Sequence, residues 1–297
     1  MAKNKPFESS VPIELLLKGT VSAPILNGYT LRESDVVGTL SVLQHDGRIL
    51  LVTCEHVFRR WGDLGPLVAP ILEVDIEDGK GVQKWITVNL KRFRWLGFKL
   101  GVTTEELDGY FDIRVALLPE PEKELINQDL ILPVQRASAI GDVFNAVLTG
   151  YPERKNTKDK IRKRKPHPWA KTWWYEMLST DAPTANKRLE FAWSHKSGNY
   201  IFEQQTANDK AKFVSTGSAP LPHGVSGGPL IFLGSRSDST VSPSTVVGYG
   251  MEYDQEAKKI IAGPSDVIID IGDALINREA NGEILVKGDI LPRMADI

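Results

Sequence analysis

The sequence predicts an all-β fold, built as barrels or a sandwich and completed by one C-terminal helix. Short apolar or alternating runs recur along the chain, rich in valine, isoleucine, threonine and aromatic residues, and Gly, Asp, Asn or Pro separates each run from the next. Helical periodicity is sparse. Many short strands divided by turn residues are typical of antiparallel barrels and sandwiches. The runs lie at 36–58, 66–81, 84–101, 111–119, 142–152, 199–205, 228–234 and 244–253.

The first long run contains the strongest turn signal. Asp46-Gly47 divides it into two apolar halves, which is the pattern of a two-residue hairpin. His45 lies beside this turn, and we therefore interpret it as an exposed turn residue rather than a ligand.

Two segments have helical character. The better one is 265–282, where Ser265 is a candidate cap and Asn281-Gly282 a candidate end. The other is 119–130, whose acidic residues suit the first turn of a short helix.

The composition is that of an ordinary globular protein. The 297 residues are enough for one large domain or two modest ones, and the formal net charge of −2 argues against a dedicated nucleic-acid binder. The single cysteine, Cys54, excludes an intrachain disulfide and fits a reducing compartment. No run approaches the roughly 18 apolar residues of a membrane span, and the first 19 residues lack the apolar core of a signal peptide. We therefore expect a cytoplasmic protein with no membrane partner.

The segment 153–174 is dense in Lys and Arg and interrupts the strand pattern. The simpler interpretation is a solvated surface loop inserted between strands. The alternative is a docking patch for an acidic partner or a phosphate backbone, helped by Trp169, Trp173 and Trp174. His167 belongs to this segment and has no obvious partner.

The stretch "PHGVSGGPL", residues 222–230, places Ser226 among three glycines. One explanation is a tight turn into the following strand. The other is a loop that aims backbone N–H groups and the serine hydroxyl at one point, as acyl transfer requires. A serine nucleophile also needs a base and a carboxylate that orients the base.

His56 is the best candidate base among the five histidines, because it ends a buried apolar strand. A histidine packed at a strand end is the simpler interpretation, but it is less favoured once the aspartate and serine motifs are considered together with it. His223 is only three residues before Ser226, too close along the same loop to approach the hydroxyl from the opposite side. The others lie in turns or loops: His45, His167 and His195.

Asp112 is the candidate carboxylate. It begins an apolar strand in which Ile113, Val115 and Leu117 alternate inward. A carboxylate entering a core strand is costly unless it is hydrogen-bonded, and a histidine N–H would supply that bond. A strand-initiating cap is the alternative for Asp112, whereas Asp108 looks like a plain turn residue.

Three motifs, in this order, resemble those of the trypsin-like (chymotrypsin-fold, PA clan) serine proteases. "LLVTCEHVF" resembles their histidine strand, "FDIRVALL" their aspartate strand and "GVSGGPLI" their nucleophile loop. The resemblance implies two six-stranded antiparallel β-barrels. Residues 1–130 would carry His56 and Asp112, and residues 131–297 would carry Ser226, the basic insertion and a helix near 266–280.

The same resemblance implies a role for each candidate. Ser226 would be the nucleophile, His56 the general base and acid, and Asp112 the group that orients the imidazole. The N–H groups of Gly224 and Ser226 would form the oxyanion hole. No cofactor and no metal are implied.

The resemblance also implies a protein or peptide substrate bound as an added strand. Tyr249 and Gly250, in "VVGYGME", would line the cleft, and His223 would lie on the rim of the first specificity pocket. The stretch "SAPLP" before the nucleophile loop contains no acidic residue, which argues against a preference for Arg or Lys.

One departure from the digestive members is informative. They carry an aspartate just before the serine, which pairs with a new N-terminus after cleavage, whereas this chain has Val225. The likeness is therefore nearer to the HtrA-type and bacterial intracellular branch, which also lacks disulfides; Cys54 would be a buried core thiol. That branch suggests cleavage of a specific partner protein, in a bacterial signalling or anti-phage defence setting.

Two other functions stay open at this point. One is a catalytically silent protease fold that works as a binding module through its basic segment. The other is hydrolysis of a different acyl substrate, such as an ester, on the same triad. The complete set of His56, Asp112 and Ser226 favours an enzyme, and the long segment 153–215 is where a regulatory flap is expected.

Overall fold

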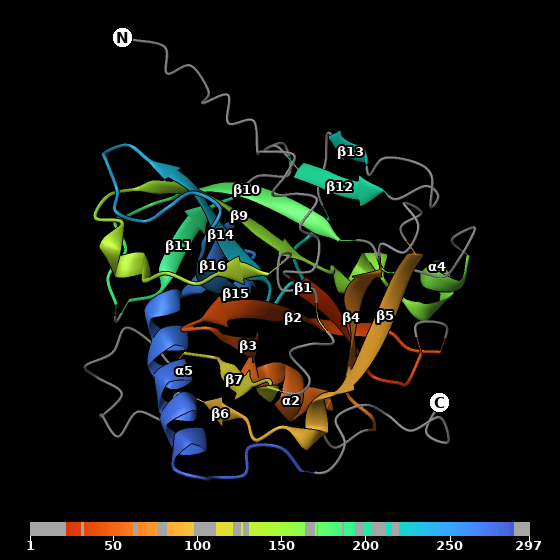
Figure 1. Ribbon diagram of the computed structural model, residues 1–297. Coiled ribbons are helices and arrows are strands. Elements are labelled where there is room, and N and C mark those ends of the chain that lie inside the picture. The colour runs from red at the N-terminus through yellow and green to blue at the C-terminus, as the bar shows by residue number, and fades with distance from the viewer. Residues whose placement is uncertain are drawn as a thin grey trace.

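The fold class expected from the sequence is confirmed: two mainly antiparallel sheets and a final helix, α5 (Ser265–Ala280), dominate the described residues (Figure 1). In the described part of the chain, no helix combines the length and the apolar character that a membrane crossing requires. The computed structural model describes residues 22–30, 33–61, 65–75, 82–97, 111–120, 126, 131–163, 170, 172–185, 187–193, 199–203, 212–215 and 220–287.

The first sheet has the strand order β5-β4-β1-β2-β3-β7-β6, with β8 paired to β2. It does not close among the described residues, so the expected first six-stranded barrel is an open curved sheet here. The C-terminal segment lies beside the stretch just before β6, where Phe93 pairs with Val286. The strands are β1 (Ser22–Leu26), β2 (Val36–His45), β3 (Arg48–Thr53), β4 (Val68–Asp75), β5 (Val82–Asn89), β6 (Leu96–Gly97), β7 (Arg114–Leu117) and β8 (Leu132–Pro133).

The second sheet has the order β11-β16-β15-β14-β9-β10-β12-β13, and pairing of β11 with β10 closes six of its strands into a barrel. Its strands are β9 (Phe144–Gly150), β10 (Trp173–Ser179), β11 (Leu189–Ala192), β12 (Asn199–Glu203), β13 (Lys212–Ser215), β14 (Pro229–Ser235), β15 (Val246–Asp254) and β16 (Lys259–Pro264). The short helices are α2 (Glu55–Trp61), η2 (Leu90–Arg92), η4 (Ala137–Ala139), η5 (Glu153–Lys155) and α4 (Lys158–Arg162).

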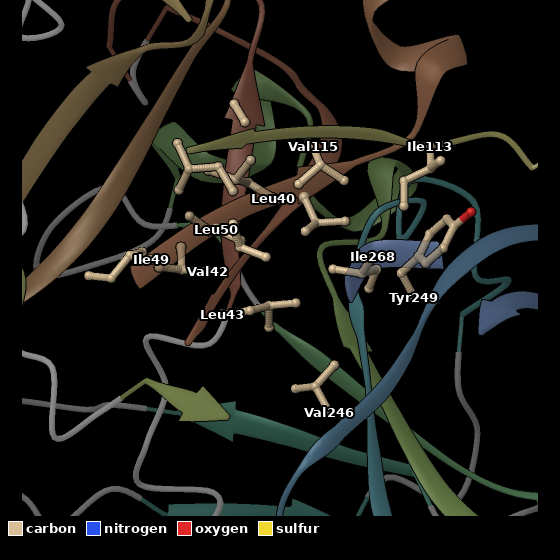
Figure 2. Close-up of a cluster of buried hydrophobic side chains, with 14 of the residues drawn as sticks. Leu40, Val42, Leu43, Ile49, Leu50, Ile113, Val115, Val246, Tyr249 and Ile268 are labelled. Atoms are coloured by element: carbon tan, nitrogen blue, oxygen red, sulfur yellow. The ribbon is translucent and has the colours of Figure 1, made fainter. Parts of the chain in front are cut away.

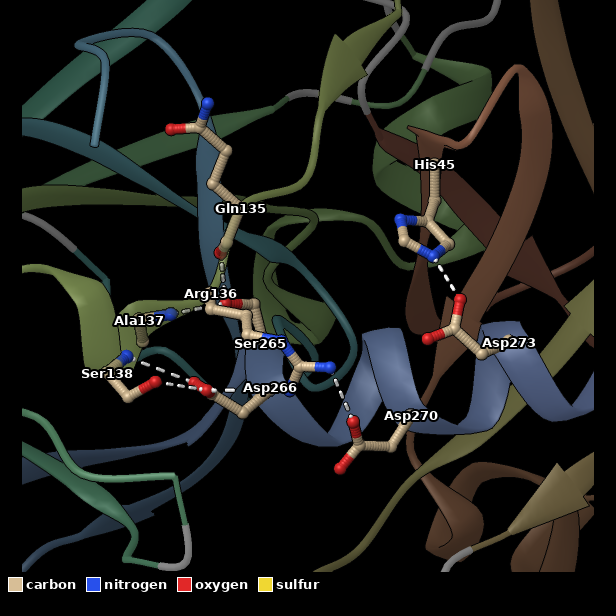
Figure 3. Close-up of polar contacts among 9 residues, drawn as sticks. All are labelled: His45, Gln135, Arg136, Ala137, Ser138, Ser265, Asp266, Asp270 and Asp273. Atoms are coloured by element: carbon tan, nitrogen blue, oxygen red, sulfur yellow. Dashed lines mark hydrogen bonds and ion pairs between the residues drawn. The ribbon is translucent and has the colours of Figure 1, made fainter. Parts of the chain in front are cut away.

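The predicted hairpin joins β2 to β3. Both of its turn residues have positive φ, 47° at Asp46 and 71° at Gly47, as a two-residue hairpin requires. The prediction that His45 is an exposed turn residue is wrong. Its side chain is 16% exposed, and Nε2 lies 2.7 Å from Oδ1 of Asp273 on α5 (Figure 3), because the helix covers this end of the hairpin.

Helix α5 spans the predicted range, but Ser265 is its first residue rather than its cap. The Ser265 hydroxyl instead donates to the carbonyl of Gln135 and accepts the N–H of Ala137 at 3.0 Å (Figure 3). The start of the helix therefore holds the connection between the two sheets. Gly282, with φ +81°, follows the end of the helix as predicted.

The largest buried cluster joins the two sheets (Figure 2). Leu40 and Leu50 of the first sheet pack in the same cluster as Val246 and Tyr249 of β15 and Ile268 of α5. Burying apolar side chains across this boundary stabilises one arrangement of the sheets at roughly 25 cal/mol per Å². The ends of β3 and β7 are thereby fixed relative to β14 and β15.

Candidate active site

His56 lies in the first turn of α2, directly after β3. The strand ends at Thr53, and the helix begins where the carbonyl of Cys54 accepts the N–H of Val57 at 3.3 Å. The His56 side chain is 38% exposed, so the ring extends from the buried strand end toward solvent.

Asp112 lies next to His56 because β3 and β7 pair antiparallel, with Thr53 opposite Arg114. The backbone N–H of His56 donates to Oδ1 of Asp112 at 2.9 Å, and the ring Nδ1 bonds Oδ2. An ionised carboxylate only accepts, so the ring proton belongs on Nδ1. The other ring nitrogen, Nε2, is then left able to accept a proton.

The environment of Asp112 favours the ionised carboxylate. Burial raises its pKa, but this effect is outweighed by the hydrogen bonds and charge of His56 and by the charge of Arg59. The net result is a pKa below the ordinary value of an aspartate. Asp112 is therefore a permanent anion at neutral pH, suited to holding an imidazole and stabilising its protonated form.

An ion pair joins the same two segments. Arg114 Nη2 donates to Glu55 Oε1 at 2.7 Å, and Nε contacts the second oxygen. The side chains are 31% and 20% exposed respectively. Glu55 immediately precedes His56, and Arg114 follows Asp112 by two residues. Sequence reasoning missed this pair, although one charge inside each of two apolar runs was an available signal.

In the nucleophile loop, residues 223–226, every backbone carbonyl has a donor. Because buried carbonyls need partners, these bonds fix the path of the loop. The His223 carbonyl accepts the N–H of Glu153 at 2.8 Å, and the Val225 carbonyl accepts the N–H of Gly228 at 2.8 Å. Thr39 bonds the other two: its hydroxyl donates to the Gly224 carbonyl at 3.0 Å, and its N–H donates to the Ser226 carbonyl at 3.0 Å.

Some backbone N–H groups of the same loop are hydrogen-bonded within the described protein, and others are not. Val225 N–H donates to the carbonyl of Pro222 at 3.2 Å, whereas the N–H groups of Gly224 and Ser226 have no acceptor in the described part of the chain. The C=O and N–H of a trans peptide point in opposite directions. Because the carbonyls of His223 and Val225 are bonded within the protein, the N–H groups of Gly224 and Ser226, in the same two peptides, point away from those bonds. Two free donors beside a serine are what an oxyanion hole requires.

Close packing requires glycine at two positions, one in the loop and one directly after it. Gly224 has φ +92°, and a Cβ there would lie 2.5 Å from Glu153 N. Gly227 has φ +88°, and a Cβ there would lie 2.2 Å from the carbonyl of Thr39. A side chain at either position would displace the loop from the first sheet or from η5.

The Ser226 hydroxyl donates to the carbonyl of Met251 at 3.0 Å. The contacts of the described residues include no hydrogen bond between Ser226 and His56. The two segments nevertheless meet at one carbonyl, that of Gly250. This carbonyl accepts a hydrogen bond from the thiol of Cys54, two residues before His56, at 3.3 Å. It also accepts the N–H of Gly227, the residue after Ser226, at 2.8 Å.

The structure does not support Tyr249 and Gly250 as cleft residues. Tyr249 is completely buried, and both backbone groups of Gly250 are bonded within the protein. The register of β15 against β16 shifts just after Gly250, which brings the Met251 carbonyl to Ser226 instead. His223 is exposed, and its ring lies edge-on to Tyr253 with centroids 6.0 Å apart.

Cys54, His56 and Asp112 are the residues that qualify as metal ligands in the described chain, since one donor atom of each lies within 4.8 Å of the others. The donors do not fit an ion well. Burial, followed by the charge of Asp112, raises the pKa of the Cys54 thiol, so the metal-binding thiolate is disfavoured. The other two donors are bonded to each other.

The remaining candidates play no part in the described site. Trp173 and Trp174, on β10, are 4% and 3% exposed, so they do not offer surface rings to the docking patch considered as an alternative. Trp173 packs in the core of the second barrel, and Trp174 packs in the cluster that joins the two sheets. Four other predictions concern residues outside the described part of the chain: Asp108, His167, Trp169 and His195.

No family model matches this sequence, and no curated protein matches it. Among solved structures, the chain is similar to a thermostable serine protease, AL20, from an extremophilic microorganism. The identity is 10%, the match covers 86% of this chain and 97% of that one, and the TM-score is 0.44. The geometry described above, rather than this likeness, carries the functional conclusion.

Proposed function

We propose that the protein is a serine endopeptidase that cleaves peptide bonds through an acyl-enzyme on Ser226. One observation carries the proposal: the amides of Gly224 and Ser226 are free in a loop whose carbonyls are all bonded. Such fixed donors stabilise the charge that develops on a substrate carbonyl oxygen. The His56–Asp112 pair nearby supplies the base that a serine nucleophile needs.

The proposed reaction begins with rotation of the Ser226 hydroxyl away from Met251 and toward His56. Catalytic hydrogen bonds often form only when substrate is bound. Nε2 of His56 takes the hydroxyl proton while Oγ attacks the substrate carbonyl carbon. The protonated ring, stabilised by Asp112, then gives its proton to the leaving amine, and water releases the acyl group by the same steps.

The substrate is proposed to bind as an extended strand beside β15. The pairing of β14 with β15 ends at Tyr249, whereas β16 pairs with β15 as far as Asp254. The 251–254 portion of β15 therefore has an unpaired edge among the described residues, and it begins at the carbonyl that contacts Ser226. A peptide added to this edge gains main-chain hydrogen bonds in a register set by the strand.

Val225 supports an enzyme that needs no N-terminal cleavage. Its side chain is 4% exposed and packs in the core of the second barrel. An apolar residue there offers no carboxylate for a new N-terminus, and the surrounding loop is already held by the carbonyl bonds described above.

A fluorophosphonate probe tests the proposal. We expect it to label the wild type and the exposed-serine control Ser242→Ala, but not Ser226→Ala. Iodoacetamide should leave labelling unchanged, because Cys54 is fully buried. Cleavage of an unfolded protein substrate by the labelled species distinguishes a peptidase from an esterase. Absence of labelling in the folded wild type, or equal labelling of Ser226→Ala, overturns the proposal.

A further inference from the structure

The segment 153–163, which comprises η5 and α4 and is called the basic segment below, starts in contact with the nucleophile loop. Glu153 N–H donates to the carbonyl of His223 at 2.8 Å. A Cβ on Gly224 would lie 3.0 Å from Glu153 Cβ. The basic segment therefore begins directly beside the loop that carries Ser226.

The basic segment is anchored to the first sheet, so its surface is ordered. Lys158 N–H donates to Oδ1 of Asp35 at 2.8 Å, and Val36 N–H donates to the carbonyl of Asn156 at 3.3 Å. Asn156 and Ile161 are completely buried beneath it. The remaining side chains project from a fixed base rather than from a free loop.

The net charge of this surface is strongly positive. The basic segment contains six Lys or Arg and two Asp or Glu, a net +4 in a chain whose net charge is −2. Arg154, Lys158, Lys160 and Lys163 are exposed, and none of them pairs with a carboxylate among the described residues. Positive charge that is not paired in this way attracts a ligand of the opposite sign.

We propose that the basic segment is an exosite for an acidic stretch of the polypeptide substrate itself, which makes acidic-flanked polypeptides the preferred substrate class. This inference rests on the proposed function. The basic segment extends at most roughly 20 Å from the nucleophile loop, which an extended substrate spans in about six residues. The acidic residues are therefore within about six positions of the scissile bond.

A polypeptide fits this surface better than a nucleic acid. Trp173 and Trp174 are buried, so the described surface presents neither of them as a platform for stacking bases. Asp159 interrupts the run of positive charge and would face a phosphate backbone. A short acidic peptide can place its carboxylates around this one residue.

The test uses two peptides built on one cleavage site, mapped first in an unfolded protein substrate. One peptide carries three flanking Glu residues and the other three Gln. We expect the Glu peptide to have a KM lower by about tenfold with a similar kcat, since the exosite contacts act equally in the ground and transition states. The advantage should shrink as salt is raised from about 0.05 to 0.5 M, because the contacts are solvent-exposed.

Charge reversal locates the effect. Arg154→Glu/Lys158→Glu/Lys163→Glu should abolish the preference, leaving probe labelling and cleavage of the Gln peptide unchanged. The matched control, Lys91→Glu/Arg92→Glu/Arg236→Glu, reverses three other exposed charges and should retain the preference. Equal KM values for both peptides, or a preference that survives the first triple variant, overturns the exosite.

Two further outcomes separate the alternatives. Competition by a short DNA duplex, with no preference between the peptides, indicates a nucleic-acid surface and overturns the proposal. Failure of the fluorophosphonate to label the wild type overturns the proposed function, whereas a labelled enzyme indifferent to flanking Glu overturns the exosite alone.

Discussion

The hydroxyl of Thr39 on β2 donates to the carbonyl of Gly224 at 3.0 Å, linking the first sheet to the nucleophile loop across 185 residues of sequence. The same hydroxyl accepts the N–H of Tyr151 at 3.1 Å, and the Thr39 N–H donates to the carbonyl of Ser226 at 3.0 Å. Thr39 is completely buried. One side chain and its own amide thus hold two of the carbonyls that position the loop.

Replacing Thr39 with valine should impair both stability and catalysis. Thr39→Val leaves the Gly224 carbonyl and the Tyr151 amide without partners, and each such loss costs about 1–3 kcal/mol. Removing an oxyanion donor outright costs about 10²–10³ in kcat, so loosening the loop should slow fluorophosphonate labelling by about 10–100-fold. Labelling rates and urea unfolding measure the two effects.

Two variants control for this substitution. Thr39→Ser keeps the hydroxyl and should retain most of the labelling rate. Thr149→Val makes the same replacement at a buried hydroxyl that has no partner in the described structure, and it should cost neither rate nor stability. Wild-type labelling by Thr39→Val would refute the role given to Thr39.

The sequence indicated much of this site because its signals are local. The apolar run before His56 and the alternating run after Asp112 predict strand ends, and β3 and β7 do pair and bring these two residues together. The hairpin at Asp46-Gly47 and the span of α5 were local signals of the same kind.

Three features could not be read locally. The Thr39 contact joins residues far apart in sequence, and no periodicity encodes it. The cleft strand was predicted at Tyr249 and Gly250, but after a register shift at Gly250 it is the Met251 carbonyl that contacts Ser226. His45 was predicted to be exposed, because the neighbouring sequence shows only the turn. The helix α5 that covers it comes from far along the chain.

The Glu55–Arg114 pair should position His56 relative to Asp112. Arg114→Ala leaves Glu55 without its bidentate partner beside His56 and Asp112. Because the groups are partly exposed, we expect a loss of about 1–2 kcal/mol in the free energy of unfolding. If the pair acts by positioning His56, we also expect a lower kcat with little change in KM. Urea unfolding and peptide kinetics measure both.

Rescue separates the geometry of this pair from its charge. Arg114→Lys keeps the charge but cannot form the two-point contact, so it should recover stability only in part and leave kcat low. The double variant that exchanges the charges, Glu55→Arg with Arg114→Glu, should be more stable and more active than the sum of the two single changes predicts. If the effects of the two single changes simply add in the double variant, the pair does not act as a unit.

The lowered pKa of Asp112 predicts how stability depends on pH. A carboxylate whose pKa is lower folded than unfolded stabilises the fold above its unfolded pKa, and the contribution is lost as the pH falls through the folded pKa. The unfolded value for aspartate is about 3.9. Asp112→Asn should therefore destabilise the protein at pH 7, and its difference from the parent should shrink below about pH 4. Urea unfolding between pH 3 and 7, in a Ser226→Ala background that prevents self-cleavage, measures this difference. An equal difference at both ends of that range would show that Asp112 does not stabilise the fold as an anion.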